Sequence, residues 1–304
     1  MTDAGLTALT AMRFHFISGL PRSGSTMLSA LLRQNPRFHA GVTSPLASLV
    51  GSLLDHVSAG SEWGPQVDVE RRRALLLGLF QSYYAQVKNE VIFDTNRSWT
   101  AKLPVLLDLF PSARIIACVR NVAWIMDSIE RLYQANPYEN TRLYSSDAER
   151  SSVYSRLEAL AQRNRMVGLA YSALKEAYYG PHGRSMLVVE YDLLTQRPAE
   201  VVPLIYKFLG EEPFAHDYDN LAFDTPAYDE GLGLKGLHKV REKVSFERRE
   251  TILPPDLFDQ YSRLSFWRDT EFGRTNVLMV KADAKAENNE PVRGGNASAR
   301  GIGG

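Results

Sequence analysis

Short apolar runs alternate with longer segments of helical periodicity along most of the chain. Continuous apolar runs predict buried strands at residues 14–18, 91–93, 114–119 and 186–189. Apolar positions three and four residues apart predict helices at 25–34, 69–88, 99–110, 122–133, 151–179, 198–209 and 257–266. This alternation is typical of an α/β protein, in which helices flank a central, mostly parallel sheet.

Composition divides the chain near residue 275. With 44% hydrophobic residues, the chain can bury a full core, and residues 1–275 are expected to form a single domain. Residues 276–304 are rich in Ala, Asn, Glu and Gly, which predicts a disordered tail. Residues 225–244 combine glycines with basic side chains and are predicted to form a long functional loop.

Charge and cysteine content exclude several classes of protein. The formal net charge is zero, so there is no overall basic field to attract nucleic acid. Cys118 is the only cysteine, which excludes an intramolecular disulfide or a thiolate metal cluster. No apolar run approaches the roughly 20 residues that span a bilayer, and no signal peptide is recognisable. We expect a cytoplasmic protein without a membrane span, and leave a homodimer open.

The segment GLPRSGST, residues 19–26, follows the first predicted strand and opens the first predicted helix. It has the glycine frame of a phosphate-binding loop, in which backbone amides and a helix N-terminus hold an anion. Ser25 stands where such loops carry the Lys that reaches the terminal phosphates of a nucleoside triphosphate. Arg22 instead offers a planar, permanently charged fork. We therefore expect a less charged terminal group, such as a sulfonate, bound without a metal.

A second segment, CVRNVAWIMDS, places Arg120 at the end of the third predicted strand. Ligands of α/β sheets bind beyond the carboxyl ends of the strands, so Arg120 is expected to face the same crevice as residues 19–26. Ser128 lies about two helical turns further on and can reach a phosphate that Arg120 holds. The alternative for Arg120 is an ordinary ion pair at a strand end.

Three segments together, between about residues 14 and 267, resemble sulfotransferases that use 3′-phosphoadenosine 5′-phosphosulfate (PAPS). FISGLPRSGSTML resembles the family's loop for the 5′-phosphosulfate, CVRNVAWIMDS its 3′-phosphate motif, and VVEYDLLTQRPAEVVPLIYKFLG its strand–helix segment. The resemblance is nearest to tyrosylprotein and related bacterial or carbohydrate sulfotransferases. It implies a P-loop-type three-layer sandwich and metal-independent in-line transfer of a sulfonate to an acceptor hydroxyl or amine. The acceptor stays open between a carbohydrate, a phenol, a peptide and a small metabolite.

The resemblance also implies which residues contact PAPS. These residues are Pro21, Arg22, Ser23, Gly24, Ser25, Thr26, Arg120, Ser128 and Tyr191. Sulfotransferases often close a late, basic, glycine-containing loop over the 3′-phosphate, and by placement Lys235 and Arg241 are expected there. A solvated basic loop is the alternative.

The acceptor needs a base to take its proton, and here the chain departs from the family. Thr43 stands where tyrosylprotein sulfotransferases carry a catalytic Glu. Asp94, at the end of the second predicted strand, is the expected replacement. Arg97, with Asn96, is expected to hold the sulfonate or the acceptor, while Arg22 stabilises the transition state. A structural role for Asp94, as a helix cap or partner of Arg97, and His238 as the base are the alternatives.

Two other interpretations stay open. The first is a kinase-like protein with a degenerate loop, which would need a magnesium-binding Asp at a neighbouring strand end. The second is an inactive module that binds PAPS, which the missing family Glu favours.

Overall fold

The computed structural model describes residues 12–279 apart from 137, 139–140, 222–237, 239 and 272. Its centre is a six-stranded sheet of order β2-β3-β1-β4-β5-β6, in which every neighbouring pair is parallel. The strands are β1 (Arg13–Gly19), β2 (Phe38–Ala40), β3 (Val91–Thr95), β4 (Ile115–Val119), β5 (Met186–Glu190) and β6 (Asn276–Leu278). The predicted α/β class with a parallel sheet is confirmed.

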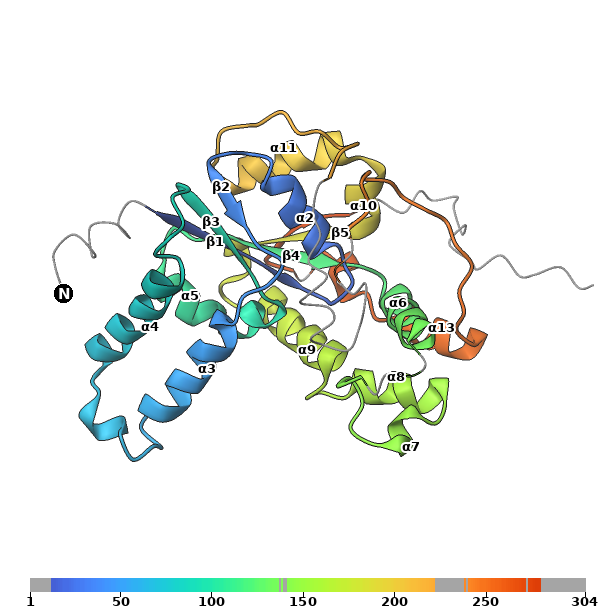
Figure 1. The fold of residues 1–304 in the computed structure, drawn as a ribbon, viewed down its shortest axis with the longest axis horizontal. Coiled ribbons are helices and arrows are strands. Elements are labelled where there is room, and N and C mark those ends of the chain that lie inside the picture. The colour runs from blue at the N-terminus through green and yellow to red at the C-terminus, as the bar shows by residue number, and fades with distance from the viewer. Residues whose placement is uncertain are drawn as a thin grey trace, which may run out of the picture.

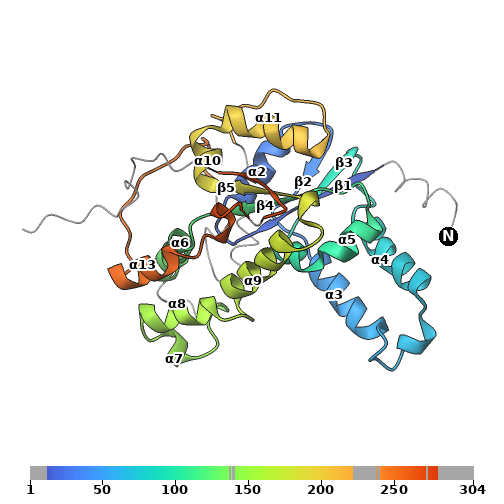
Figure 2. The ribbon, with the colours of Figure 1, turned by 180° about the vertical axis from the view of Figure 1, so that it is seen from behind.

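Helices cover both faces of the sheet, which gives three layers (Figures 1 and 2). One face carries α2 (Ser25–Leu32), α10 (Tyr191–Gln196) and α11 (Pro198–Leu209). The helices of the other layer are α3 (Leu46–Val57), α4 (Val69–Tyr83), α5 (Leu103–Leu109), α6 (Val122–Ala135), α8 (Val153–Ala161), α9 (Met166–Tyr179) and α13 (Pro255–Ser262). The remaining helical elements of the described residues are α7 (Asp147–Arg150) and the 3₁₀ turns η1 (Gly64–Gln66), η2 (Arg97–Lys102), η3 (Gly183–Ser185) and η4 (Phe266–Arg268).

The side-chain alternation of the central strands separates two cores. In β1, Phe14 and Phe16 point to the α9 side, whereas Ile17 points to the α2 side. Strand β4 does the same, with Ile115 on the first side and Cys118 on the second. Because successive residues of a strand face opposite sides, an unbroken apolar run is what two covered faces require. Burial also raises the pKa of the Cys118 thiol to about 12, so it is an inert core residue.

Two strands were not predicted. Strands β2 and β6 have three residues each, too few for a period-two pattern to stand out. Strand β6 pairs with β5 and lies just past residue 275, where composition placed the end of the domain. The sheet therefore includes residues that the sequence assigned to the tail.

Two predicted helices are each divided in the structure. The segment predicted as one helix at 151–179 forms α8 and α9, because the backbone leaves the helical region at Gln162 (ψ 145°) and is extended at Arg165 (ψ 173°). Residues 99–110 begin in the η2 turn and become α-helical only at Leu103, followed by Pro104. The predicted helix at 198–209 is observed with these bounds and ends at Gly210, whose φ of 71° is left-handed.

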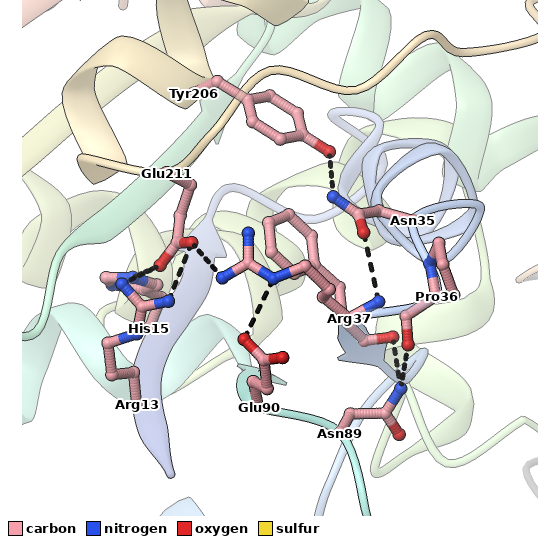
Figure 3. A network of polar contacts seen from close by, with 10 residues as sticks. Arg13, His15, Asn35, Pro36, Arg37, Asn89, Glu90, Tyr206 and Glu211 are labelled. Carbon is pink, nitrogen blue, oxygen red and sulfur yellow. Dashed lines mark hydrogen bonds and ion pairs between the residues drawn. The ribbon is translucent and has the colours of Figure 1, made fainter. Parts of the chain in front are cut away.

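A polar network closes the amino end of β1 (Figure 3). The buried carboxylate of Glu211 pairs with Arg13 at 2.9 Å and with Arg37 at 3.4 Å. The ring of His15 lies between the Glu211 carboxylate and the backbone of Arg114. Its Nε2 is 3.6 Å from Glu211, and its Nδ1 accepts a hydrogen bond from the Arg114 amide. His15 is thus a buried structural residue near the amino end of β1, whereas residues 19–26 lie at the carboxyl end of the same strand. Among the described residues, no helix combines the length and the apolar character that crossing a bilayer requires.

Candidate active site

Residues 19–26 form a curled loop between β1 and α2. Its backbone turns left-handed three times, at Gly19 (φ 109°), Arg22 (φ 57°) and Gly24 (φ 88°). Alternation of right- and left-handed residues points successive amides inward, which makes an anion-binding concavity. Gly24 precedes α2 without a side-chain cap, so the first amides of that helix face the concavity.

Both glycines of the loop are required by close neighbours as well as by φ. A Cβ at Gly19 would collide with the backbone of Cys118, the residue it pairs with in β4. A Cβ at Gly24 would lie 2.7 Å from the ring of Tyr191. The loop is therefore held against β4 and against the start of α10.

Arg22 and Ser128 connect the loop with α6. Arg22 Nε donates a 3.0 Å hydrogen bond to Ser128 Oγ. Arg120, one residue beyond β4, lies over the Tyr191 ring, with Cζ 4.4 Å from the ring centroid. The structure thus gathers four residues that the sequence placed in one crevice, from the ends of β1, β4 and β5 and from α6.

A cavity of about 240 Å³ opens at this edge of the sheet. The residues predicted to bind or react that line it are Pro21, Arg22, Gly24, Ser25, Thr26, Arg97, Arg120, Ser128, Tyr191 and Arg241, together with Thr43, Asn96 and His238. Ser23 does not line it, because its buried hydroxyl donates to the Pro21 carbonyl oxygen and shapes the loop from behind. Lys235 lies outside the described residues.

Sequence reasoning did not name Lys243, Ser245 and Arg249, which line one wall of the cavity beside the predicted Arg241. Lys243 lies within the predicted loop at 225–244, whereas Ser245 and Arg249 lie beyond it. The segment 240–249 has no regular helix or strand, but its backbone is anchored: the Val244 amide donates to the Tyr218 carbonyl oxygen, and the Leu221 amide donates to Glu242. The available signal was the basic run KVREKVSFERR, which continues past Arg241.

The cavity is strongly cationic. Six of its described lining residues are Arg or Lys, and none is Asp or Glu: Arg22, Arg97, Arg120, Arg241, Lys243 and Arg249. Carboxylates stand behind four of these cations, at Asp192, Glu247, Asp219 and Asp127. Burial raises the pKa of Asp192, although the charge of Arg120 opposes the rise. Each pair neutralises part of the charge, and the cavity still presents guanidinium groups to a polyanion.

Asp94 does not reach the cavity, which argues against its predicted role as the base. The strand β3 runs on to Thr95, so Asp94 lies inside the sheet rather than at its edge. Its fully buried carboxylate accepts hydrogen bonds from Ser44 Oγ (2.8 Å), Tyr84 Oη (2.6 Å) and Trp99 Nε1 (2.7 Å). Burial raises the pKa of Asp94, and these three donors oppose the rise. The structure gives it an anchoring role instead.

That anchor fixes the side of the cavity nearest β2 and β3. Ser44 follows Thr43 in sequence, and Asn96 Nδ2 donates to the Ser44 carbonyl oxygen at 2.9 Å. Trp99 belongs to the η2 turn, which begins at Arg97. Asp94 therefore ties together the two segments that place Thr43, Asn96 and Arg97 on the cavity wall.

No group of three or more His, Cys, Asp or Glu side chains gathers as a metal site within the described part of the chain. Among the described lining residues, His238 is the side chain that can act as a neutral base. It is partly buried, and it lies in the segment that was predicted as a functional loop.

Comparison with known proteins gives one family. Residues 15–216 match the sequence model described as the sulfotransferase family. The nodulation protein NoeE of Sinorhizobium fredii (strain NBRC 101917 / NGR234) is 26% identical over 219 residues, which is 65% of this chain. The chain spans about half of NoeE, since the match covers 50% of that protein.

Solved structures with a similar arrangement are more distant. The sulfotransferase domain from the curacin biosynthetic pathway is 13% identical, with a TM-score of 0.47 over 84% of this chain and 92% of that domain. A sulfotransferase from Alicyclobacillus acidocaldarius is 18% identical, with a TM-score of 0.46 over 73% of this chain and 89% of that protein.

Proposed function

The chain belongs to the sulfotransferase family, and we propose that it transfers a sulfonate group from PAPS to a hydroxyl or amine of an acceptor. The observation that carries this proposal is the hydrogen bond from Arg22 to Ser128. It brings the loop at residues 19–26 and the motif that starts at Arg120 to one cavity. These are the two segments that a donor charged at both ends needs.

The residues present fit such a donor. At one end, the loop amides and Arg22 suit a phosphosulfate. At the other end, the Nε atoms of Arg120 and Arg249 are buried and have no hydrogen-bond partner among the described residues, although Arg120 Nε lies 3.7 Å from Asp192 Oδ1. Buried donors of this kind favour an anionic acceptor group such as a phosphate. The Tyr191 ring lies between the loop and Arg120, whose guanidinium covers one face of the ring, so an aromatic group stands beside both anion-binding segments.

The order of the strands supports an assignment of the two sides of the cavity. Strand β1 with its loop is central, β4 and β5 lie on one side, and β3 and β2 lie on the other. Arg120 and Tyr191 follow β4 and β5, so the nucleotide belongs on that side. Thr43 and Asn96 follow β2 and β3, which leaves their side for the acceptor.

Bound there, PAPS would supply the sulfonate: a bond forms from the acceptor atom to sulfur, and the bond from sulfur to the 5′-phosphate oxygen breaks. Arg22 and the loop amides are preorganised donors beside the group on which negative charge grows. The acceptor's proton must pass to a base, and His238 is the described lining residue best suited to take it. Asp94 instead fixes Thr43 and Arg97 in place.

The test is thermal unfolding with adenosine 3′,5′-bisphosphate in the absence of metal, beside ATP with Mg²⁺. A ligand at about 100 times its dissociation constant stabilises the folded state by about 2.7 kcal/mol, enough to shift the midpoint. The proposal expects a shift with the bisphosphate. A shift with ATP and Mg²⁺ alone would favour a kinase-like protein.

A sulfonate-transfer assay with a panel of carbohydrates, phenols, tyrosine peptides and small hydroxylated metabolites completes the test. Transfer to one class would identify the acceptor. Tight binding of the bisphosphate with no transfer to any class would favour an inactive module that binds the nucleotide.

A further inference from the structure

Asp127 and Ser128 are neighbours on α6 that contact two different walls of the cavity. Ser128 accepts the hydrogen bond from Arg22 of the loop. The Asp127 carboxylate is completely buried and faces the segment 249–252. Two consecutive residues of one helix therefore contact the loop at residues 19–26 and the chain that closes the cavity opposite it.

The Asp127 carboxylate contacts four groups. With residues 249–252 it forms an ion pair to an Arg249 guanidinium nitrogen (2.6 Å) and accepts hydrogen bonds from Thr251 Oγ1 (3.1 Å) and the Ile252 amide (2.9 Å). It also accepts a hydrogen bond from Arg131 Nε at 2.9 Å, one helical turn along α6. A buried carboxylate with this many partners fixes the residues that contact it.

Of the residues that contact Asp127, Arg249 is the one that also lines the cavity, so Asp127 acts on the cavity through Arg249. Its guanidinium carbon lies 5.5 Å from the centroid of the Trp124 ring, and its Nε is buried without a hydrogen-bond partner among the described residues. Burial lowers the pKa of Arg249; Asp127 opposes this, and the nearby charges of Arg120 and Arg131 add to it. Arg249 and Arg120 are thus neighbouring cations at the nucleotide side of the cavity.

We propose that Asp127 is a positioning residue: by holding residues 249–252 against α6, it directs Arg249 to the phosphate that Arg120 binds. This rests on the proposed function. Arg249 then shares the 3′-phosphate of the nucleotide with Arg120, whereas the 5′ end of the nucleotide depends on the loop at residues 19–26. Discrimination between nucleotides with and without a 3′-phosphate is therefore set in part by a carboxylate that does not touch the ligand.

The experiment measures dissociation constants of adenosine 3′,5′-bisphosphate and of adenosine 5′-phosphate, which lacks the 3′-phosphate, by calorimetry without metal. Arg249→Gln should raise the dissociation constant of the bisphosphate by about tenfold or more, because one charged hydrogen-bond donor is lost. Its affinity for the 5′-phosphate should stay within about twofold of the wild type. Asp127→Asn should move the same preference in the same direction, and the double variant should be no weaker than Arg249→Gln alone.

Further variants separate positioning from folding. Thr251→Val removes one tether without burying a new charge, and it should lower the preference for the bisphosphate while the protein stays folded. Arg131→Gln removes a donor to Asp127 and a bond to the Glu250 carbonyl oxygen, so it should lower the preference as well. Arg263→Gln is the control, because Arg263 is exposed and does not line the cavity, and it should leave the preference unchanged.

The outcomes are distinct. Equal losses for both nucleotides in Arg249→Gln and Thr251→Val, or a lower unfolding midpoint with unchanged preference, would overturn the positioning role. A wild-type protein that does not bind the bisphosphate at all would instead overturn the proposed function.

Discussion

Arg22 and Ser128 are 106 positions apart in the sequence, and a 3.0 Å hydrogen bond joins their side chains. The bond orients the guanidinium from a backbone that is itself left-handed at Arg22. An arginine at such a φ is strained, and strain of this kind is typical of functional sites. The hydrogen bond therefore holds the Arg22 guanidinium between the nucleotide side and the acceptor side of the cavity.

Replacement of Arg22 should therefore affect turnover. Arg22→Ala is expected to lower kcat by roughly a hundredfold or more, about 3 kcal/mol, which is the loss found for one preorganised donor to developing charge. Arg22→Lys should recover part of the rate, because it retains the charge without the planar fork. Steady-state sulfonate transfer measures this, with Arg263→Ala as the exposed control outside the cavity lining. Unchanged kcat in Arg22→Ala would remove this residue from the reaction.

His238 is expected to act on the acceptor and not on the nucleotide. His238→Gln should lower kcat by about 10²–10⁴-fold, the usual contribution of a general base. The acidic limb of the pH–kcat profile should disappear, while the stabilisation by adenosine 3′,5′-bisphosphate persists. His56→Gln, an exposed histidine on α3, is the matched control. A variant that retains the wild-type pH profile would place the base on another group.

Replacement of Asp94 is expected to lower the free energy of unfolding more than it affects nucleotide binding. Asp94→Asn alters an acceptor for Ser44, Tyr84 and Trp99 in a fully buried place, so unfolding should become easier by about 1–3 kcal/mol. Urea denaturation gives this value, and the bisphosphate shift should remain. An Asp94→Asn protein that is as stable as the wild type but inactive would restore the sequence-based role of this residue as the base.

Glu211 gives a pH dependence remote from the site (Figure 3). Burial alone would raise the pKa of Glu211, but the neighbouring His15 ring and the charges of Arg13 and Arg37 outweigh it and lower the pKa. A lowered pKa means that the folded state prefers the carboxylate. This stabilisation is present above the unfolded pKa of about 4.3 and is lost as the pH falls through the lower, folded value.

Glu211→Gln should accordingly reduce the free energy of unfolding by about 2 kcal/mol at neutral pH. The difference from the wild type should shrink as the pH falls below about 4. Urea unfolding at several pH values measures it, and Glu212→Gln, its exposed neighbour, is the matched control. A penalty that does not change with pH would mean that the charge of Glu211 is not what stabilises the network.

Sulfonate transfer is expected to proceed without a metal ion. The loop carries Ser25 instead of the lysine that, together with Mg²⁺, neutralises the terminal phosphates of a nucleoside triphosphate. Exhaustive treatment with a chelator should leave kcat unchanged, and added Mg²⁺ should not raise it beyond an ionic-strength effect. Loss of activity that only a divalent cation restores would contradict this prediction.

The sequence carried much of the fold and of the nucleotide side of the site. Strands that are covered on both faces are continuous apolar runs, and the loop is recognisable because left-handed backbone and close neighbours require Gly19 and Gly24. Arg120 could be placed because it ends such a run. These features depend on local sequence, so they can be predicted from it.

Two other features of the site, the place of Asp94 and the contribution of Arg249, could not be predicted in the same way. Asp94 was assigned to the edge of the sheet because the apolar run stops at Phe93, whereas the strand continues to Thr95 and buries the carboxylate. Arg249 belongs to a segment without periodicity, which is held by Asp127 from 122 positions earlier. Neither a strand's polar end nor a tertiary tether leaves a periodic signal in the sequence.

The central position of β1 has a consequence for how the protein reaches its native state. In its register Arg13 pairs with Val91 and Phe16 with Ile115, so both neighbours of the strand are distant in the chain. Such non-local pairing has a large loop-closure entropy and slows folding. The cavity needs both pairings, so it forms only when the long-range topology is complete. A ligand that requires the assembled cavity is therefore expected to slow unfolding and to leave the early folding steps unchanged.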